Sequence, residues 1–259
     1  MGKPAPSAAL ILKDIRSALD SRLDGRADKK SVASKSPLKA LGARPTLVRA
    51  IAREIEGKTR PSVEYSAAVA LVDAAVARKV REEILVALEI LGHHEKNFAP
   101  GLFARVEKWS AVADDVDVAE VLGTGIAAPA LRLEPAKLSV VKKWAKLKSL
   151  GKRHLAVLAA TGLVMDGYRE AAAVLNLAEM LLDEENPLMV GAVARLLRET
   201  TRVDAKAVQD FLFRRSIDGN PDILRAGSEN LDAARRAALI AKLEAQAALT
   251  VPLAAAAER

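Results

Sequence analysis

The chain has 259 residues, of which 51% are hydrophobic and 28% charged, and its formal net charge at pH 7 is +7. It contains no cysteine, which excludes disulfides, thiol catalysis and thiolate metal sites and is typical of a reducing cytoplasm. No uninterrupted apolar run reaches the roughly 18 residues that a membrane span requires. We therefore expect a soluble, cytoplasmic protein whose excess positive charge favours a polyanionic partner.

The predicted secondary structure is helical throughout. Hydrophobic residues are mostly Ala, Leu and Val, and only 3% of residues are aromatic, which favours helices over strands. In chain order, the predicted helices are 7–23, 46–57, 62–77, 81–91, 101–109, 115–122, 135–148, 152–165, 168–182, 189–201, 205–215 and 231–249. A spacing of about 16 to 22 residues with short polar turns is typical of stacked helical hairpins. The sequence thus predicts an all-α, HEAT-like helical repeat solenoid with a concave basic face, built as a single domain over residues 1–259.

Four segments interrupt this pattern. Residues 1–6 and 251–259 are predicted to be disordered ends, and the polar, charged stretch 24–36 is predicted to be a linker or mobile loop. The glycine-containing segment 122–125 follows a predicted helix and not a strand, so we interpret it as a helix stop and not as a phosphate-binding loop.

Basic side chains gather on two predicted helices. Segment 137–153 carries seven basic residues and no acid. In helix 135–148 the apolar side includes Trp144, which we therefore assign to the core. The opposite side carries Lys142, Lys143 and Lys146. A second basic stripe, on helix 189–201 and just beyond it, consists of Arg195, Arg198 and Arg202. Such faces are often only solvated, but clustered lysine and arginine also suit contact with a phosphate backbone.

The start of the predicted helix 152–165 is unusual in its charge. Ser149 is a plausible N-cap, which places Lys152, Arg153 and His154 in or near the first turn. The helix dipole opposes positive charge there, so an anion is needed to offset the cost. Free amide groups together with Lys152 and Arg153 would bind a phosphate.

Three acids lie at the start of the predicted helix 115–122. Asp114 or Asp115 can act as its N-cap, and Asp117 suits the helix dipole in the first turn. The spacing lacks the glycine turn and terminal glutamate of a calcium loop, so a metal site is not expected. His93 and His94 also lack the spacing of a zinc motif.

Several short blocks, taken in order, resemble one protein family. They are Leu41-Gly42, Arg44 to Arg49, Val106-Glu107-Lys108-Trp109 followed by Asp114, Leu150-Gly151-Lys152-Arg153, and Gly191 to Glu199. Over residues 37–216 the chain is similar to the DNA alkylation repair proteins, the AlkD-like HEAT-repeat DNA glycosylases. These enzymes hold double-stranded DNA in a concave basic groove and cleave the N-glycosidic bond of purines alkylated at N3 or N7.

The resemblance implies roles for individual residues. The catalytic carboxylate falls on Asp114, with Asp115 as the alternative, and the phosphate-binding arginine falls on Arg153. Arg198 keeps an arginine of the late helix motif, and Trp109 keeps the first of two adjacent tryptophans. The resemblance also implies duplex DNA as partner, no cofactor and no metal, and we expect a monomer that does not contact membranes.

Three aromatic positions of the family are replaced here. Ser110 stands where the second tryptophan faces the lesion, Arg195 replaces the tryptophan of the late helix, and a tyrosine falls near Ala33. Losing aromatic contacts worth about 1–3 kcal/mol each would weaken lesion selection. Three hypotheses therefore stand: an alkylpurine DNA glycosylase, a DNA-binding protein without catalysis, and a HEAT-like scaffold for protein interactions.

Overall fold

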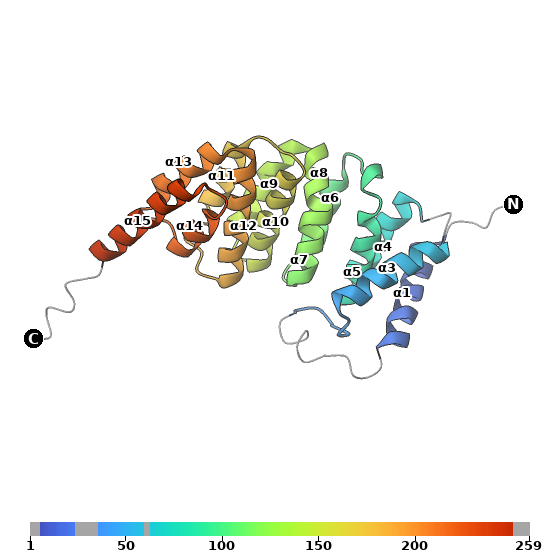
Figure 1. The fold of residues 1–259 in the computed structure, drawn as a ribbon. Helices are drawn as coiled ribbons and strands as arrows, with labels where there is room; N and C mark the ends of the chain where they lie inside the picture. The colour runs from blue at the N-terminus through green and yellow to red at the C-terminus, as the bar shows by residue number, and fades with distance from the viewer. Residues whose placement is uncertain (1–5, 24–35, 60–62, 251–259) are drawn as a thin grey trace, which may run out of the picture. The chain divides into compact units, whose positions relative to one another are not determined.

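The computed structural model describes residues 6–23, 36–59 and 63–250 (Figure 1). These residues are helical with no strand among them, which confirms the all-α prediction. The chain divides into two compact units, Met1–Gly162 and Leu163–Arg259. The predicted linker lies outside the described residues apart from its last position, as does Ala33. No helix within the described ranges is long and apolar enough to cross a membrane.

The first unit consists of short helices joined by tight turns. Its α-helices are α1 (Ala8–Arg22), α3 (Pro45–Thr59), α4 (Tyr65–Arg78), α5 (Arg81–Gly92), α6 (Leu102–Trp109), α7 (Val116–Leu122), α8 (Ala128–Leu133), α9 (Leu138–Ala145) and α10 (Leu150–Met165), the last ending three residues into the second unit. Three 3-10 turns, Glu95–Asn97, Ser110–Val112 and Pro135–Lys137, connect them.

Helix α5 is the centre of the first unit. Ten of its twelve residues are buried, so it is enclosed by other elements nearly all round, and the buried residues after its first turn are apolar. It packs against α3, α4 and α7, which surround it in Figure 1. The core of this unit is therefore formed largely by the buried side chains of α5 and of the helices around it.

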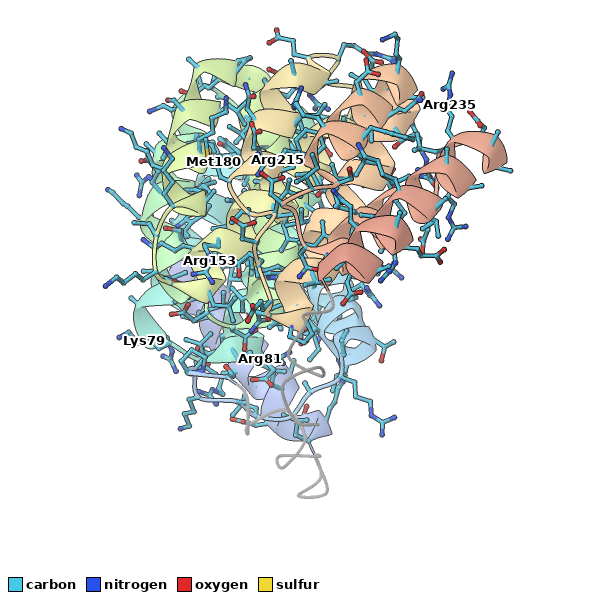
Figure 2. All side chains as sticks on the ribbon, turned by 90° about the vertical axis from the view of Figure 1, so that its left-hand side faces the viewer. Lys79, Arg81, Arg153, Met180, Arg215 and Arg235 are labelled. Carbon is cyan, nitrogen blue, oxygen red and sulfur yellow. The ribbon has the colours of Figure 1, made fainter. Side chains whose placement is uncertain are left out.

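The first turn of α5 brings charge into that core. Arg81 is 3% exposed (labelled in Figure 2). Its Nε donates to Asp115 Oδ2 at 3.1 Å, while its remaining nitrogens pair with Asp117 and, at 3.4 Å, with Glu82. A buried cation is tolerated only when anions and hydrogen bonds compensate its desolvation, and this arrangement supplies both. Arg81 thereby joins α5 to the start of α7.

The two glutamates that follow are held from other directions. The Glu82 carboxylate accepts hydrogen bonds from the backbone nitrogens of Leu41, at 2.8 Å, and Gly42, at 2.9 Å. Gly42 has a φ of 89°, a conformation that glycine adopts without strain. Glu83 is fully buried and pairs with Arg16 at 2.8 Å and Arg78 at 2.9 Å. The segment at Leu41 and Gly42, helix α1 and the end of α4 are thus fixed to one helix end.

The segment after α7 corrects the sequence prediction. We expected a helix stop at residues 122–125, but the chain continues as a π-helix, Gly123–Ala127, directly into α8. A Cβ atom on Gly123 would lie 2.7 Å from Leu158 Cβ, too close for any side chain. Here glycine permits close helix packing and does not end the helix. Helix α8 had no counterpart among the predicted helices.

The second unit is organised around one long helix. Its α-helices are α11 (Ala171–Glu179), α12 (Pro187–Val203), α13 (Ala205–Arg215), α14 (Pro221–Gly227) and α15 (Ala233–Thr250). Helix α12 packs against α11, α13 and α14, and α15 packs against α13 and α14. A Cβ on Gly227 would lie 2.8 Å from Leu197 Cδ1, which explains the close approach of α14 to α12. Helix α14 was not predicted from the sequence.

Replacing Arg81 should destabilise the first unit strongly. An Arg81→Leu variant leaves the carboxylates of Asp115 and Glu82 buried without their cation, a change that typically costs about 3–5 kcal/mol. We expect urea denaturation to show a loss of unfolding free energy of this order. The matched control is Lys206→Met, which removes an exposed lysine paired with Asp210 on α13 and should change stability little. Equal effects of the two substitutions would contradict the structural role of Arg81.

Candidate nucleic-acid interface

The candidate site lies where the chain before α7 meets the start of α10. Asp114 is exposed, and its Oδ1 accepts hydrogen bonds from Ser149 Oγ, at 3.0 Å, and from the backbone nitrogen of Gly151, at 3.2 Å. These contacts join residues more than 30 positions apart, and no sequence pattern had indicated them. They place a carboxylate directly at the N-terminus of α10.

Gly151 makes this approach possible. A Cβ atom at this position would lie 2.5 Å from the carbonyl oxygen of Ala113 and closer still to Asp114 Oδ1. Real Cβ atoms do not make such contacts, so any other residue would displace the Asp114 segment. The glycine is required by this contact between segments, although its own backbone is helical.

The first turn of α10 has the predicted cap. Ser149 Oγ accepts from the backbone nitrogen of Lys152 at 3.2 Å, and Ser149 O accepts from that of Arg153 at 3.1 Å, which confirms Ser149 as the N-cap. The sequence predicted a phosphate near these amides; the structure places the carboxylate of Asp114 there, on the amide of Gly151. It offsets the unfavourable interaction of Lys152 and Arg153 with the helix dipole, which amounts to about 0.3–1 kcal/mol per charge. Contact of these two side chains with a phosphate stays a prediction.

The guanidinium of Arg153 folds back over the turn that precedes α10. Its Nη1 donates to the carbonyl oxygens of Leu147, at 3.1 Å, and Lys148, at 2.8 Å. The side chain is half-buried, and Figure 2 labels it at the start of α10. Arg153 thus satisfies two backbone carbonyl groups of the turn between α9 and α10.

The neighbouring acid has a different environment. Asp115 is 2% exposed; its Oδ1 caps α7 by accepting from Val118 N at 2.9 Å, and its Oδ2 pairs with Arg81. The N-cap interpretation is therefore confirmed at Asp115. Both of its oxygens have partners inside the protein, whereas Asp114 faces solvent, so the geometry favours Asp114 for any chemistry on a bound molecule.

Trp109 and Ser110, which occupy the positions of the family's two adjacent tryptophans, lie in the core. Trp109 is 1% exposed and its Nε1 donates to Asp73 Oδ1 at 2.8 Å. Ser110 is also buried, and its hydroxyl donates to the carbonyl oxygen of Glu107 at 2.7 Å. Neither side chain presents a surface to a ligand in this conformation. Trp144 stacks on Phe103 with 5.6 Å between ring centroids, which confirms its assignment to the core.

The lysines of α9 face outward as predicted. Lys143 and Lys146 are exposed and Lys142 is half-buried, and none of the three forms an ion pair within the part of the chain that the structure describes. The helix is shorter than expected, because residues 135–137 form a 3-10 turn and α9 ends at Ala145. Leu147 lies beyond the end of this helix and is 42% exposed.

The arginines of α12 have individual partners. Arg195 is half-buried, with Nη2 3.9 Å from Met165 Sδ. Arg198 donates to the carbonyl oxygen of Ala226 at 3.1 Å and pairs with Glu229 at 3.3 Å, joining α12 to α14. Arg202 pairs with Glu199 at 2.6 Å on the helix surface. The stripe is therefore partly neutralised, and Arg198 has a packing role that its spacing did not reveal.

His154 is not part of a cationic surface. It is 4% exposed, and its Nδ1 is buried without a hydrogen-bond partner. Burial lowers the pKa of His154 below its usual value, and the negative charge of Glu120 opposes that shift only in part. The sequence places His154 with Lys152 and Arg153 at the start of α10. The structure shows that, unlike those two residues, His154 is buried.

The family comparison agrees with the resemblance read from the sequence. The chain matches the model of the DNA alkylation repair enzyme family over residues 20–231. It therefore belongs to that family, and the match extends on both sides beyond the blocks first used to recognise it. Among curated proteins, none matches the chain in sequence.

Acid should destabilise this protein partly through His154. The unfolded chain binds a proton at this residue near pH 6.5, whereas the folded chain binds it only at lower pH. Unfolding free energy is thus retained above about pH 6.5 and lost as pH falls below it. Urea denaturation between pH 7.5 and 5 should show a smaller loss for His154→Leu than for the wild-type protein. Parallel curves for the two proteins would contradict this assignment.

Proposed function

We propose that this protein binds duplex DNA through the basic surface around α9 and the start of α10, and releases purines alkylated at N3 or N7. The observation that carries the proposal is the exposed carboxylate of Asp114, held at the start of α10, the helix whose first turn carries Lys152 and Arg153. An exposed acid fixed among cations can act where positive charge develops on a sugar whose phosphates the cations bind. Family membership supports the same class of reaction.

The chemistry requires little more than such a carboxylate. A purine alkylated at N3 or N7 is cationic, so it leaves with the electron pair of the N-glycosidic bond and needs no acid. The deoxyribose then develops oxocarbenium character, which a nearby carboxylate stabilises while it orients the attacking water. Asp114 is the group proposed for this role.

Two lysines of α9 and one at its C-terminal end are proposed to hold the DNA backbone. Lys142, Lys143 and Lys146 add positive charge to the same unit that carries Asp114. Contacts of this kind position DNA without reading its sequence and weaken with salt. The arginines of α12 are proposed as further backbone contacts, and a HEAT-like concave groove, a monomeric state and a cytoplasmic location stay predictions.

A second candidate is DNA binding without base release. It is favoured by the burial of Trp109 and Ser110, because the positions that carry adjacent tryptophans in the family offer no exposed ring in this structure. A protein of this kind would recognise duplex DNA through charge and shape. It would keep the salt dependence proposed above and lack activity on methylated DNA.

Base release from methylated DNA tests the two candidates. With duplex DNA carrying N7-methylguanine or N3-methyladenine, we expect the wild-type protein to release free base and Asp114→Asn to be at least about a hundredfold slower. The asparagine oxygen can still accept the hydrogen bonds from Ser149 and Gly151, so the fold should persist. The control is Asp210→Asn, an exposed acid on α13. A wild-type protein that binds DNA without releasing base would favour the second candidate.

Salt-dependent binding tests the proposed DNA surface. Replacing Lys142 and Lys143 together by glutamine should weaken duplex binding, measured by fluorescence anisotropy. The slope of log Kd against log salt should fall by about 0.9 for each phosphate that the variant no longer neutralises. Lys13→Gln, which removes an exposed lysine on α1, is the matched control. Failure of the wild-type protein to bind any duplex near physiological salt would favour a scaffold for protein interactions.

A further inference from the structure

The two oxygens of Asp114 have unlike surroundings. Oδ1 accepts two hydrogen bonds, from Ser149 Oγ at 3.0 Å and from Gly151 N at 3.2 Å. Oδ2 has no hydrogen-bond or ion-pair partner among the described residues, and the side chain is exposed. A carboxylate held through one oxygen cannot rotate freely about its last bond. Its second oxygen therefore keeps a constant direction toward solvent.

The Ser149 hydroxyl connects this carboxylate to the helix. A hydroxyl has a single proton to donate, and here the geometry gives it to Asp114 Oδ1. The hydroxyl oxygen, Ser149 Oγ, also accepts a hydrogen bond from Lys152 N at 3.2 Å, which fixes the hydroxyl in place. Ser149 thus caps α10 and orients Asp114 with one atom.

Gly151 fixes the distance between the two segments. Its amide donates to Asp114, and the space where a Cβ would stand is filled by Asp114 Oδ1 and the Ala113 carbonyl. In the first turn of α10 this amide has no acceptor within the helix, so Asp114 is its partner. The position therefore demands both a donor and the absence of a side chain.

We propose that Ser149 and Gly151 are positioning residues that hold Asp114 so that Oδ2 alone meets the sugar and the attacking water. This inference rests on the proposed glycosylase function. It assigns to the two residues a role beyond capping, because alignment of a catalytic group within a few tenths of an ångström decides much of its effect.

Substitutions at Ser149 separate the cap from the orientation of Asp114. Glycine is a good N-cap, so Ser149→Gly should keep the thermal midpoint near that of the wild-type protein while removing the donor to Oδ1. We expect kcat for release of N7-methylguanine to fall about ten- to a hundredfold with KM unchanged. Ser149→Thr retains the hydroxyl and should restore kcat. A purely structural role would not separate kcat from KM in this way.

Gly151→Ala provides an independent test of the same contact. The added methyl group should displace the Asp114 segment and lower kcat, whereas Gly57→Ala should leave it unchanged. Gly57 lies in α3 with nothing within 4 Å of the position of its Cβ, so the two variants make the same chemical change in different surroundings. Amide hydrogen exchange of Gly151, measured by NMR, should be slow in the wild-type protein and at least about tenfold faster in Asp114→Ala, which lacks its acceptor.

The outcomes distinguish this inference from the proposed function. If the wild-type protein releases no base, the proposed glycosylase function is overturned, and so is the catalytic role of the contact of Asp114 with Ser149 and Gly151. An active wild-type protein whose Ser149→Gly and Gly151→Ala variants keep full kcat overturns the positioning role alone. Fast exchange of the Gly151 amide in the wild-type protein also counts against it, because the hydrogen bond would then not persist in solution.

Discussion

The first unit depends on the buried charges at the start of α5. Arg81, Glu82 and Glu83 follow one another in the core, and each accepts hydrogen bonds from, or forms ion pairs with, groups of a different segment. Burying a charge is costly unless its partners are in place, so the packed position of α5 is favourable only together with those of its neighbours. The cost of burying these charges therefore couples the packing of α5 to that of α1, α4 and α7.

This constraint reaches the candidate site through two consecutive acids. Asp115 is held from inside by Arg81 and by the first turn of α7, which fixes the backbone at that point. Asp114, one residue earlier, then projects outward to the start of α10. The fixed position of the buried Asp115 therefore limits the movement of the exposed Asp114. Adjacent residues of the same type thus have separate roles because opposite surroundings act on them.

Local rules predicted part of this structure and missed what depends on distant contacts. The caps at Ser149 and Asp115 and the core position of Trp144 follow from short patterns, and the structure confirms them. The contact between Asp114 and Ser149 spans 35 residues and has no signature in either segment. The π-helix after α7 was missed for a related reason, because glycine was interpreted as a helix stop when it serves close packing against α10.

The carboxylate at the start of α10 is a ligand tethered to its own binding site. A covalently attached group competes at a local concentration that dissolved ions rarely match, so inorganic phosphate or sulfate should not readily displace it. The amide of Gly151 thus has its acceptor within the protein, as do the amides of Lys152 and Arg153, which donate to Ser149. Any phosphate bound nearby must be held by flexible side chains, which adapt to a distorted backbone more easily than a rigid ring of amides can.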